Sequence, residues 1–289
     1  MAKKFLFEKK ETKKGLYLVS TPIGNLEDIS NRAIRTIKDA NIVFCENPSH
    51  SIKLLNKFGI KKKLIGLHDH NEVSIVSEYK ERFKDNIIVL ISDSGSPLIS
   101  DPGYKLVRYC LTNGIFVTTI PGANSLIPAL QLSSFPINEF YFGGFCPKTE
   151  KSIISFLEKI QTISVTVIFF VSSHKILNCV ELLEKILIDR QISVIKELTK
   201  INEDVVTGYP IEIIEKIKDK KFVLKGEFII VIEPSDQKKA SNDNTNIHNE
   251  EILKLLTKFS LTDVVQIVHK LTNIKKNEVY RKALKLKND

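Results

Sequence analysis

The sequence lacks most of the features that would place it in a specialised class of protein. Its 289 residues include no tryptophan, one methionine and four cysteines. The cysteines are far apart and form no Cys-x-x-Cys pair, so we expect reduced thiols, with neither a disulfide framework nor a metal site. No apolar run approaches the roughly 18 residues of a membrane span, and the first residues lack the apolar core of a signal peptide. We expect a cytoplasmic protein that does not associate with a membrane.

Signatures of phosphate-bearing nucleotides are also missing. The sequence has no Gly-x-x-x-x-Gly-Lys-Ser/Thr loop, and its first loop, Thr21-Pro22-Ile23-Gly24-Asn25, has one glycine where a dinucleotide fingerprint needs three. A cofactor without phosphate, bound by backbone groups, an aspartate and small hydroxyls, fits this composition better.

The positive charge is concentrated at the two ends of the chain. The net charge is +9, of which residues 1–14 carry +4, from six lysines and two glutamates. Residues 251–289 carry +5, from nine basic and four acidic side chains, so the residues between have no net charge. A neutral body with basic ends is typical of an enzyme that meets a polyanion, although lysine-rich composition alone gives the same pattern.

Strands and helices alternate along the first part of the chain. Short apolar strands are predicted at 16–20, 41–45, 87–92 and 115–120, and helices at 28–40, 51–58 and 101–113. This alternation predicts a mainly parallel sheet that helices cover on both faces.

A second α/β half is predicted after residue 123. Its helices are expected at 125–132 and 175–187, and its strands at 140–142, 165–171, 192–195 and 227–232. Residues 235–249 contain almost nothing apolar and read as a linker, followed by helices at 250–259, 262–271 and 277–287. The predicted organisation is a basic tail (1–14), an α/β domain (15–122), a second α/β domain (123–234), a linker (235–249) and a basic helical module (250–289).

Three loops rich in glycine and proline follow strands of the first sheet. They are Thr21–Asn25, Ser92–Gly103 and Ile120–Ser125. Ligands of open parallel sheets gather beyond the carboxyl ends of the strands, and glycine lets a backbone approach a ligand closely. Any one of these loops could be a plain turn, but together they favour a cofactor cleft.

The sequence of these loops resembles a known family. The segments LYLVSTPIGNLEDI (16–29), SDSGSPLISDPG (92–103), PGANS (121–125), GFCP (144–147), ELTK (197–200) and KGEF (225–228) are similar, in order and spacing, to those of the small-subunit ribosomal RNA methyltransferases of the tetrapyrrole methylase superfamily. The resemblance implies two α/β domains with S-adenosylmethionine in the cleft between them and a homodimer. It also implies 2′-O-methylation of a cytidine of small-subunit (16S) rRNA near the decoding centre, with free rRNA or the 30S subunit as partner.

Matching the motifs position by position gives the cofactor residues that the resemblance implies. They are Pro22, Gly24, Asp93, Gly95, Ser96, Asn124, Ser125 and Gly226. Candidates for the acceptor of the ribose proton are Lys200, Glu203, His70 and Glu46. Lys200 and Glu203 would share a face if their segment were helical, which also suits a plain surface ion pair.

The sequence departs from the family at several arginine positions. Glu46-Asn47-Pro48-Ser49-His50 stands where the family has Glu-Asp-Thr-Arg, and Lys196 stands where it has arginine. Lysine cannot reproduce the bidentate phosphate contact of a guanidinium. These changes weaken the case for RNA binding more than the case for cofactor binding.

A basic cluster is predicted on the last helix to hold RNA phosphates, with Val279, Tyr280 and Leu284 packing that helix on its neighbours. The cluster is Lys275, Lys276, Arg281, Lys282 and Lys285. Two other functions remain open, a methylase of a small tetrapyrrole and a non-catalytic RNA-binding or assembly protein. The appended basic helices argue against the first, and the intact cofactor loops argue against the second.

Overall fold

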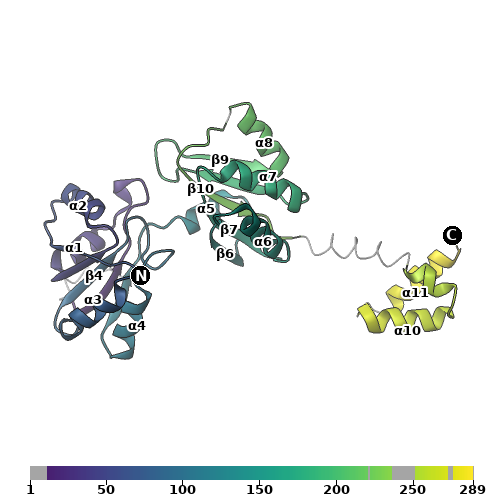
Figure 1. The fold of residues 1–289 in the computed structure, drawn as a ribbon, viewed down its shortest axis with the longest axis horizontal. Coiled ribbons are helices and arrows are strands. Elements are labelled where there is room, and N and C mark those ends of the chain that lie inside the picture. Colours follow the sequence, from purple (N-terminus) through teal and green to yellow (C-terminus); the bar gives the residue numbers. More distant parts are fainter. Residues whose placement is uncertain (1–11, 221, 236–250, 273–275, 289) are drawn as a thin grey trace, which may run out of the picture. The chain divides into compact units, whose positions relative to one another are not determined.

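The computed structural model describes residues 12–220, 222–235, 251–272 and 276–288. The chain divides into two compact units, Met1–Pro234 and Ser235–Asp289 (Figure 1). Among the described residues, no helix is both long enough and apolar enough to span a membrane.

The first unit begins with a five-stranded sheet in the order β3-β2-β4-β1-β5. All of its strand pairs are parallel, which confirms the prediction from the strand and helix alternation. Its strands are β1 (Gly15–Val19), β2 (Ile42–Cys45), β3 (Leu64–Gly66), β4 (Ile87–Ile91) and β5 (Val117–Ile120). Its helices are η1 (Leu26–Asp28), α1 (Asn31–Asp39), α2 (Pro48–Lys57), α3 (Glu72–Tyr79), η2 (Lys80–Arg82) and α4 (Tyr104–Thr112).

Both faces of this sheet are buried under helices. Val89 and Ile91 of β4 pack in one cluster with residues of α1 and α2, whereas Ile88 and Leu90 pack in another with residues of α4. Successive side chains of a strand point to opposite faces, so a strand covered on both sides is apolar throughout. This burial fixes the carboxyl ends of β1, β4 and β5 side by side.

A second five-stranded sheet, in the order β6-β7-β10-β8-β9, follows in the same unit. Only β6 and β7 are parallel, and the other pairs are antiparallel. Its strands are β6 (Phe140–Phe145), β7 (Thr166–Ser172), β8 (Ile192–Lys196), β9 (Asp204–Gly208) and β10 (Glu227–Ile232). Its helices are α5 (Leu126–Leu132), α6 (Glu150–Gln161), α7 (Ile176–Ile186) and α8 (Pro210–Lys218).

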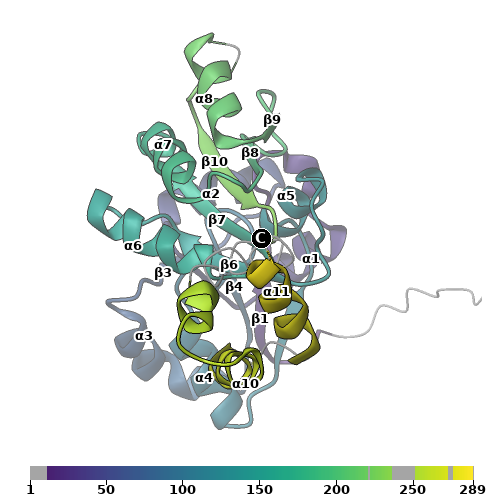
Figure 2. The same cartoon turned by 90° about the vertical axis from the view of Figure 1, so that its right-hand side faces the viewer.

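The two faces of the second sheet are covered differently. Helices α6, α7 and α8 bury one face, with Val167 and Ile230 in their cluster. The other face packs Ile168 and Ile229 against α5, together with Ile23 from the loop after β1. Figure 2 shows α5 on the opposite side of this sheet from α6 and α7. Helix α5 has only seven residues, so it covers part of this face and leaves room for a cavity.

The second unit is a small helical module with its own core. It contains a helix over 251–256, α10 (Leu261–Thr272) and α11 (Lys276–Asn288). Val279 and Ala283 of α11 are buried with residues of the other two helices, which confirms the prediction for Val279. The prediction was wrong for Tyr280 and Leu284, whose side chains are 47% and 39% exposed. Each follows a buried residue by one position, about 100° further round the helix.

Candidate functional site

The loops that follow β1 and β4 are joined directly to each other. The backbone N–H of Thr21 donates to the carbonyl of Gly95 at 2.9 Å, and the N–H of Gly95 donates back to Thr21 at 3.0 Å. The hydroxyls of Ser20 and Ser96 are 2.8 Å apart. Gly95 has a φ of +82°, a conformation that side chains other than glycine rarely adopt. The two loops therefore form one rigid rim.

The loop after β5 packs on the same rim. A Cβ at Gly122 would lie 2.9 Å from the Cβ of Ser20, so this close approach requires a glycine. The side-chain oxygen of Asn124 accepts a hydrogen bond from the N–H of Ile127 at 3.0 Å and begins α5. Ser125 makes no capping bond with its side chain, which leaves its hydroxyl available to a ligand.

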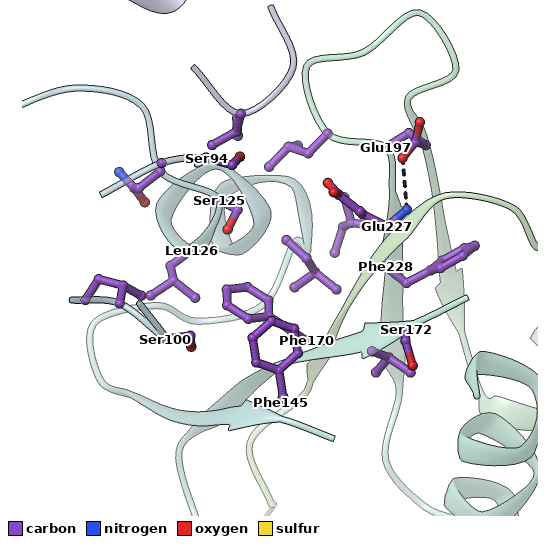
Figure 3. Close-up of a pocket in the computed structure, with 18 of the residues that line it drawn as sticks. Ser94, Ser100, Ser125, Leu126, Phe145, Phe170, Ser172, Glu197, Glu227 and Phe228 are labelled. Atoms are coloured by element: carbon purple, nitrogen blue, oxygen red, sulfur yellow. Dashed lines mark hydrogen bonds between the residues drawn. The ribbon is translucent and has the colours of Figure 1, made fainter. Parts of the chain in front are cut away.

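The rim borders a cavity of about 470 Å³ in the first unit (Figure 3). Its lining comes from the loops after β4 and β5 and from strands of the second sheet. Apolar side chains such as Leu126, Phe145 and Phe170 lie beside the hydroxyls of Ser100, Ser125 and Ser172. A mainly apolar wall with a few polar groups is typical of a small-molecule site.

Six of the eight predicted cofactor residues line this cavity. They are Asp93, Gly95, Ser96, Asn124, Ser125 and Gly226. Pro22 and Gly24 are not part of the lining, but Ile23 between them is.

Gly24 lies instead where the loop after β1 meets the segment 197–203. A Cβ at Gly24 would lie 2.5 Å from Cγ of Lys200 and 2.7 Å from Oγ1 of Thr199. The N–H of Asn25 donates to that same Thr199 oxygen at 3.2 Å. The glycine allows the first loop to dock on a loop of the second sheet beside the cavity.

The segment 197–203 is a turn, so the helical pairing of Lys200 with Glu203 is wrong. The Nζ atom of Lys200 lies 3.0 Å from a carboxylate oxygen of Glu197 and 2.8 Å from one of Glu227. Glu203 accepts a hydrogen bond from the N–H of Thr199 at 2.6 Å and does not line the cavity. It therefore stabilises the turn.

The two ion pairs also set the protonation of Lys200. Partial burial alone would lower its pKa, but hydrogen bonds from its ammonium to Glu227 and Glu197 outweigh burial and raise the pKa. The ammonium stays protonated at neutral pH, which disfavours Lys200 as a proton acceptor.

Gly226 is fixed by the same cluster. It has a φ of +105°, and a Cβ there would lie 2.4 Å from the carboxylate carbon of Glu197. The N–H of Glu227 donates to Glu197 at 2.9 Å, the dashed contact in Figure 3. Any larger residue at 226 would displace this carboxylate.

The cavity is acidic. Four carboxylates line it, and none of the lining residues is basic; the four are Asp93, Asp101, Glu197 and Glu227. The predicted candidates Glu46 and His70 do not line it. Sequence reasoning missed Asp101, Glu197 and Glu227, although all three fall inside the motifs SDSGSPLISDPG, ELTK and KGEF. Their shared position on one cavity depends on contacts between distant segments, which motif spacing does not show.

Asp101 has the most perturbed carboxyl group of the cavity. Burial, together with the negative charges of Glu46 and Asp93, raises its pKa to about 7, against a small opposing effect of a hydrogen bond with Ser92. Burial and Asp93 also raise the pKa of Glu46. A site of this kind stabilises a positive charge or a proton.

These residues fit S-adenosylmethionine better than a phosphate-bearing cofactor. Its sulfonium and ammonium groups are cationic and suit the carboxyl groups, whereas phosphates would face four acidic side chains and no basic lining residue. The apolar wall suits an adenine ring. In the part of the chain that the structure describes, no group of three or more His, Cys, Asp or Glu side chains could hold a metal ion.

The predicted RNA-binding residues lie on α11 in the second unit. Lys276 and Arg281 are exposed, and Lys282 is half-buried. Lys285 lies within α11, and Lys275 lies outside the described residues. Their contact with RNA stays a prediction.

The sequence profile of the tetrapyrrole (corrin/porphyrin) methylases matches residues 15–210. Among solved structures, a diphthine synthase superposes with a TM-score of 0.59 at 16% identity, over 75% of this chain and 89% of its own. A uroporphyrin-III-C-methyltransferase from Thermus thermophilus gives 0.50 at 15% identity, over 76% and 94%. At such low identity these structures establish the fold alone.

Curated relatives are much more similar in sequence. Ribosomal RNA small subunit methyltransferase I of Rickettsia prowazekii (strain Madrid E) is 41% identical over 247 residues, 83% of this chain and 82% of that protein. The protein of the same name from Haemophilus influenzae is 38% identical over 273 residues, 93% of this chain and 96% of that protein. The chain therefore belongs to the tetrapyrrole methylase family, in the group of ribosomal RNA small subunit methyltransferase I.

Proposed function

We propose that this protein transfers a methyl group from S-adenosylmethionine to the 2′-hydroxyl of a cytidine in small-subunit (16S) rRNA, near the decoding centre. The observation that carries the proposal is the acidic, partly apolar cavity, on which six residues of the family's motifs converge in a chain whose relatives are named as small-subunit rRNA methyltransferases. A non-catalytic protein that had lost its cofactor site would not keep the positive-φ glycines Gly95 and Gly226 beside the cavity.

S-adenosylmethionine, when bound, supplies a methyl group activated by a sulfonium. The residues of the chain then have to hold the ligand, exclude water and orient the hydroxyl that accepts the methyl group. Leu126, Phe145 and Phe170 provide an apolar wall, and Ser125 and Asp93 provide hydrogen-bonding groups in the same lining.

We further propose that the helical module supplies affinity for RNA phosphates and that the protein acts as a homodimer. Lys276 and Arg281 are exposed on α11, and contacts of such residues with phosphates carry no base specificity. Sedimentation at micromolar concentration should give twice the mass of the chain; a monomer would refute the dimer but not the transfer reaction.

The transfer reaction is tested with purified protein, S-adenosylmethionine carrying a labelled methyl group, and 30S subunits from cells that lack the protein. We expect label in the rRNA, recovered after digestion as 2′-O-methylcytidine. Free 16S rRNA, tested in parallel, distinguishes a protein that acts on free rRNA from one that acts on the assembled 30S subunit. Label in another nucleoside would refute the cytidine assignment, and label only in an added tetrapyrrole would favour the small-molecule alternative.

A further inference from the structure

The proposed reaction releases a proton from the target hydroxyl, and the cavity must receive it. Any inference about the group that receives this proton rests on the proposed function. The carboxylates within reach of a cavity ligand are Asp93, Asp101, Glu197 and Glu227. A proton acceptor must be deprotonated before the transfer and basic enough to take the proton during it.

Glu197 and Glu227 are poor acceptors because both are ion-paired with the ammonium of Lys200. Glu197 accepts hydrogen bonds from the N–H of Glu227 at 2.9 Å and from Lys200 at 3.0 Å. The backbone hydrogen bond is the largest cause of its lowered pKa. Glu227 is 2.8 Å from the same ammonium, and its side chain is 76% exposed.

Asp93 is engaged differently. One of its carboxylate oxygens accepts the backbone N–H of Asn47 at 3.2 Å, across to the loop after β2. This contact holds the carboxylate between two loops of the first sheet and occupies one of its oxygens.

Asp101 has a hydrogen bond with the side chain of Ser92, but the effect of this bond on its pKa is smaller than the effects of burial and of the neighbouring charges. Among the residues that the structure describes it forms no ion pair, and the charged groups that act on its carboxyl are Glu46 from the loop after β2 and Asp93 from the loop after β4. Both are acidic. Burial and these charges keep its pKa at about 7, the range in which a carboxyl group both loses and regains a proton at neutral pH.

The backbone holds Asp101 in place at the cavity. Leu98 and Ser100 have φ values of 70° and 68°, in the left-handed region. Gly103, with a φ of 128°, packs so closely on β4 that a Cβ would lie 2.5 Å from the Leu90 side chain. Left-handed backbone outside glycine persists only where surrounding contacts fix it. The backbone on both sides of Asp101 is thereby fixed, and with it the place at which this residue meets the cavity.

We propose that Asp101 is the acceptor of the hydroxyl proton. The hydroxyl oxygen forms the new bond to the methyl carbon, the carbon–sulfur bond breaks with its electron pair on sulfur, and the hydroxyl proton passes to the Asp101 carboxylate. The positive charge of the sulfonium disappears as the proton arrives, so the cavity keeps the same net charge throughout. Three neighbouring carboxylates, Glu46, Asp93 and Asp101, then stabilise a cation before the transfer and a proton after it.

The first test measures protons during ligand binding, without catalysis. Calorimetry at pH 7 in buffers of different ionisation enthalpy counts the protons released when S-adenosylmethionine or S-adenosylhomocysteine binds. A bound sulfonium should lower the pKa of Asp101, so the first ligand should release up to about half a proton per site and the second less. The difference should vanish in Asp101→Asn and persist in Asp189→Asn, a control at an exposed aspartate.

The second test is the pH dependence of single-turnover methylation. The wild-type rate should rise with pH and level off above the pKa of the acceptor, and Asp101→Asn should lose this rise and fall by about 10²- to 10⁴-fold. Asp101→Glu should recover part of the rate, which a merely structural role would not predict for a longer side chain. Thermal melting establishes that each variant folds.

Folding itself offers a third measurement. The folded state binds the Asp101 proton more tightly than the unfolded chain, so wild-type stability should decline as the pH rises from about 4 to about 7, and Asp101→Asn should decline less. The proposal is overturned if the wild type binds and methylates while Asp101→Asn keeps the same proton count and the same pH profile. If the wild type neither binds the cofactor nor methylates rRNA, the proposed function itself fails.

Discussion

Asp93 connects the cavity to the neighbouring loop of the first sheet. It lines the cavity, and its carboxylate accepts the N–H of Asn47. The side chain of Asn47 in turn accepts from the N–H groups of Ser49 and His50 and begins α2. The same carboxylate therefore lines the cavity and holds the loop after β2.

Replacing Asp93 by alanine should weaken binding of S-adenosylmethionine by about 10- to 100-fold, because a hydrogen bond to a charged group contributes about 1.5–3 kcal/mol. Calorimetry on the purified variant measures the change. Asp189→Ala, at an exposed position outside the cavity, is the matched control and should bind as the wild type does. Equal affinity in Asp93→Ala and wild type would remove Asp93 from the cofactor site.

Residues of the site differ in how far the sequence predicts them. Asp93, Ser96 and Ser125 are small or acidic residues in loops that follow apolar strands, and this pattern indicates the cavity edge directly. Asp101 and Glu197 gain their properties from neighbours distant in sequence, such as Glu46 and Lys200. Neither a raised pKa nor an ion pair across two loops can be read from local spacing.

At the scale of elements, α4 begins without a side-chain cap of its own. Its N-cap residue is Gly103, and the N–H of Leu106 donates instead to Glu72 of α3 at 2.8 Å. Glu72 is buried, with 2% of its surface exposed. A carboxyl oxygen from a neighbouring helix thus accepts a backbone N–H in the first turn of α4, just after the loop that carries Asp101.

Glu72→Ala should lower the free energy of unfolding by about 2–3 kcal/mol, because it leaves a buried N–H without an acceptor. Glu72→Gln keeps an acceptor oxygen and should cost less. Urea denaturation measures both, with Glu81→Ala as a control, since the Glu81 side chain is 89% exposed. If Glu72→Ala unfolds at the same urea concentration as the control, the capping interpretation is wrong.

The first sheet could be predicted better than the second, for a physical reason. In the first, each apolar strand is followed by a helix, and such crossovers impose parallel pairing. The second contains apolar strands such as β7, β8 and β10 whose composition does not distinguish parallel from antiparallel neighbours. β9 was missed because it lies among polar residues.

At the scale of the whole molecule, the helical module has its own core, and the core clusters of the first unit contain no described residue of the module. Deleting residues 235–289 should leave binding of S-adenosylmethionine nearly unchanged and weaken binding of 16S rRNA. It should also flatten the salt dependence of RNA binding, by a log–log slope of about 0.7 to 0.9 for each phosphate that the protein no longer neutralises.

A double variant tests the same module in the full chain. Lys276→Gln with Arg281→Gln should reproduce part of the decrease in slope, and Lys84→Gln, at an exposed lysine of the first unit, should not. Filter binding across a salt series measures both. Unchanged slopes in the truncated chain and in the double variant would assign the basic helix a role in stability only.

The central claim is methylation of small-subunit rRNA, and mapping ribose methylation in that rRNA tests it most directly. Cells without the protein are compared with the same cells supplied with the wild type, with Asp93→Ala or with Asp189→Ala. The account predicts one 2′-O-methylated cytidine near the decoding centre that is absent without the protein, restored by the wild type and by Asp189→Ala, and not restored by Asp93→Ala. Identical methylation maps in cells with and without the protein would contradict it.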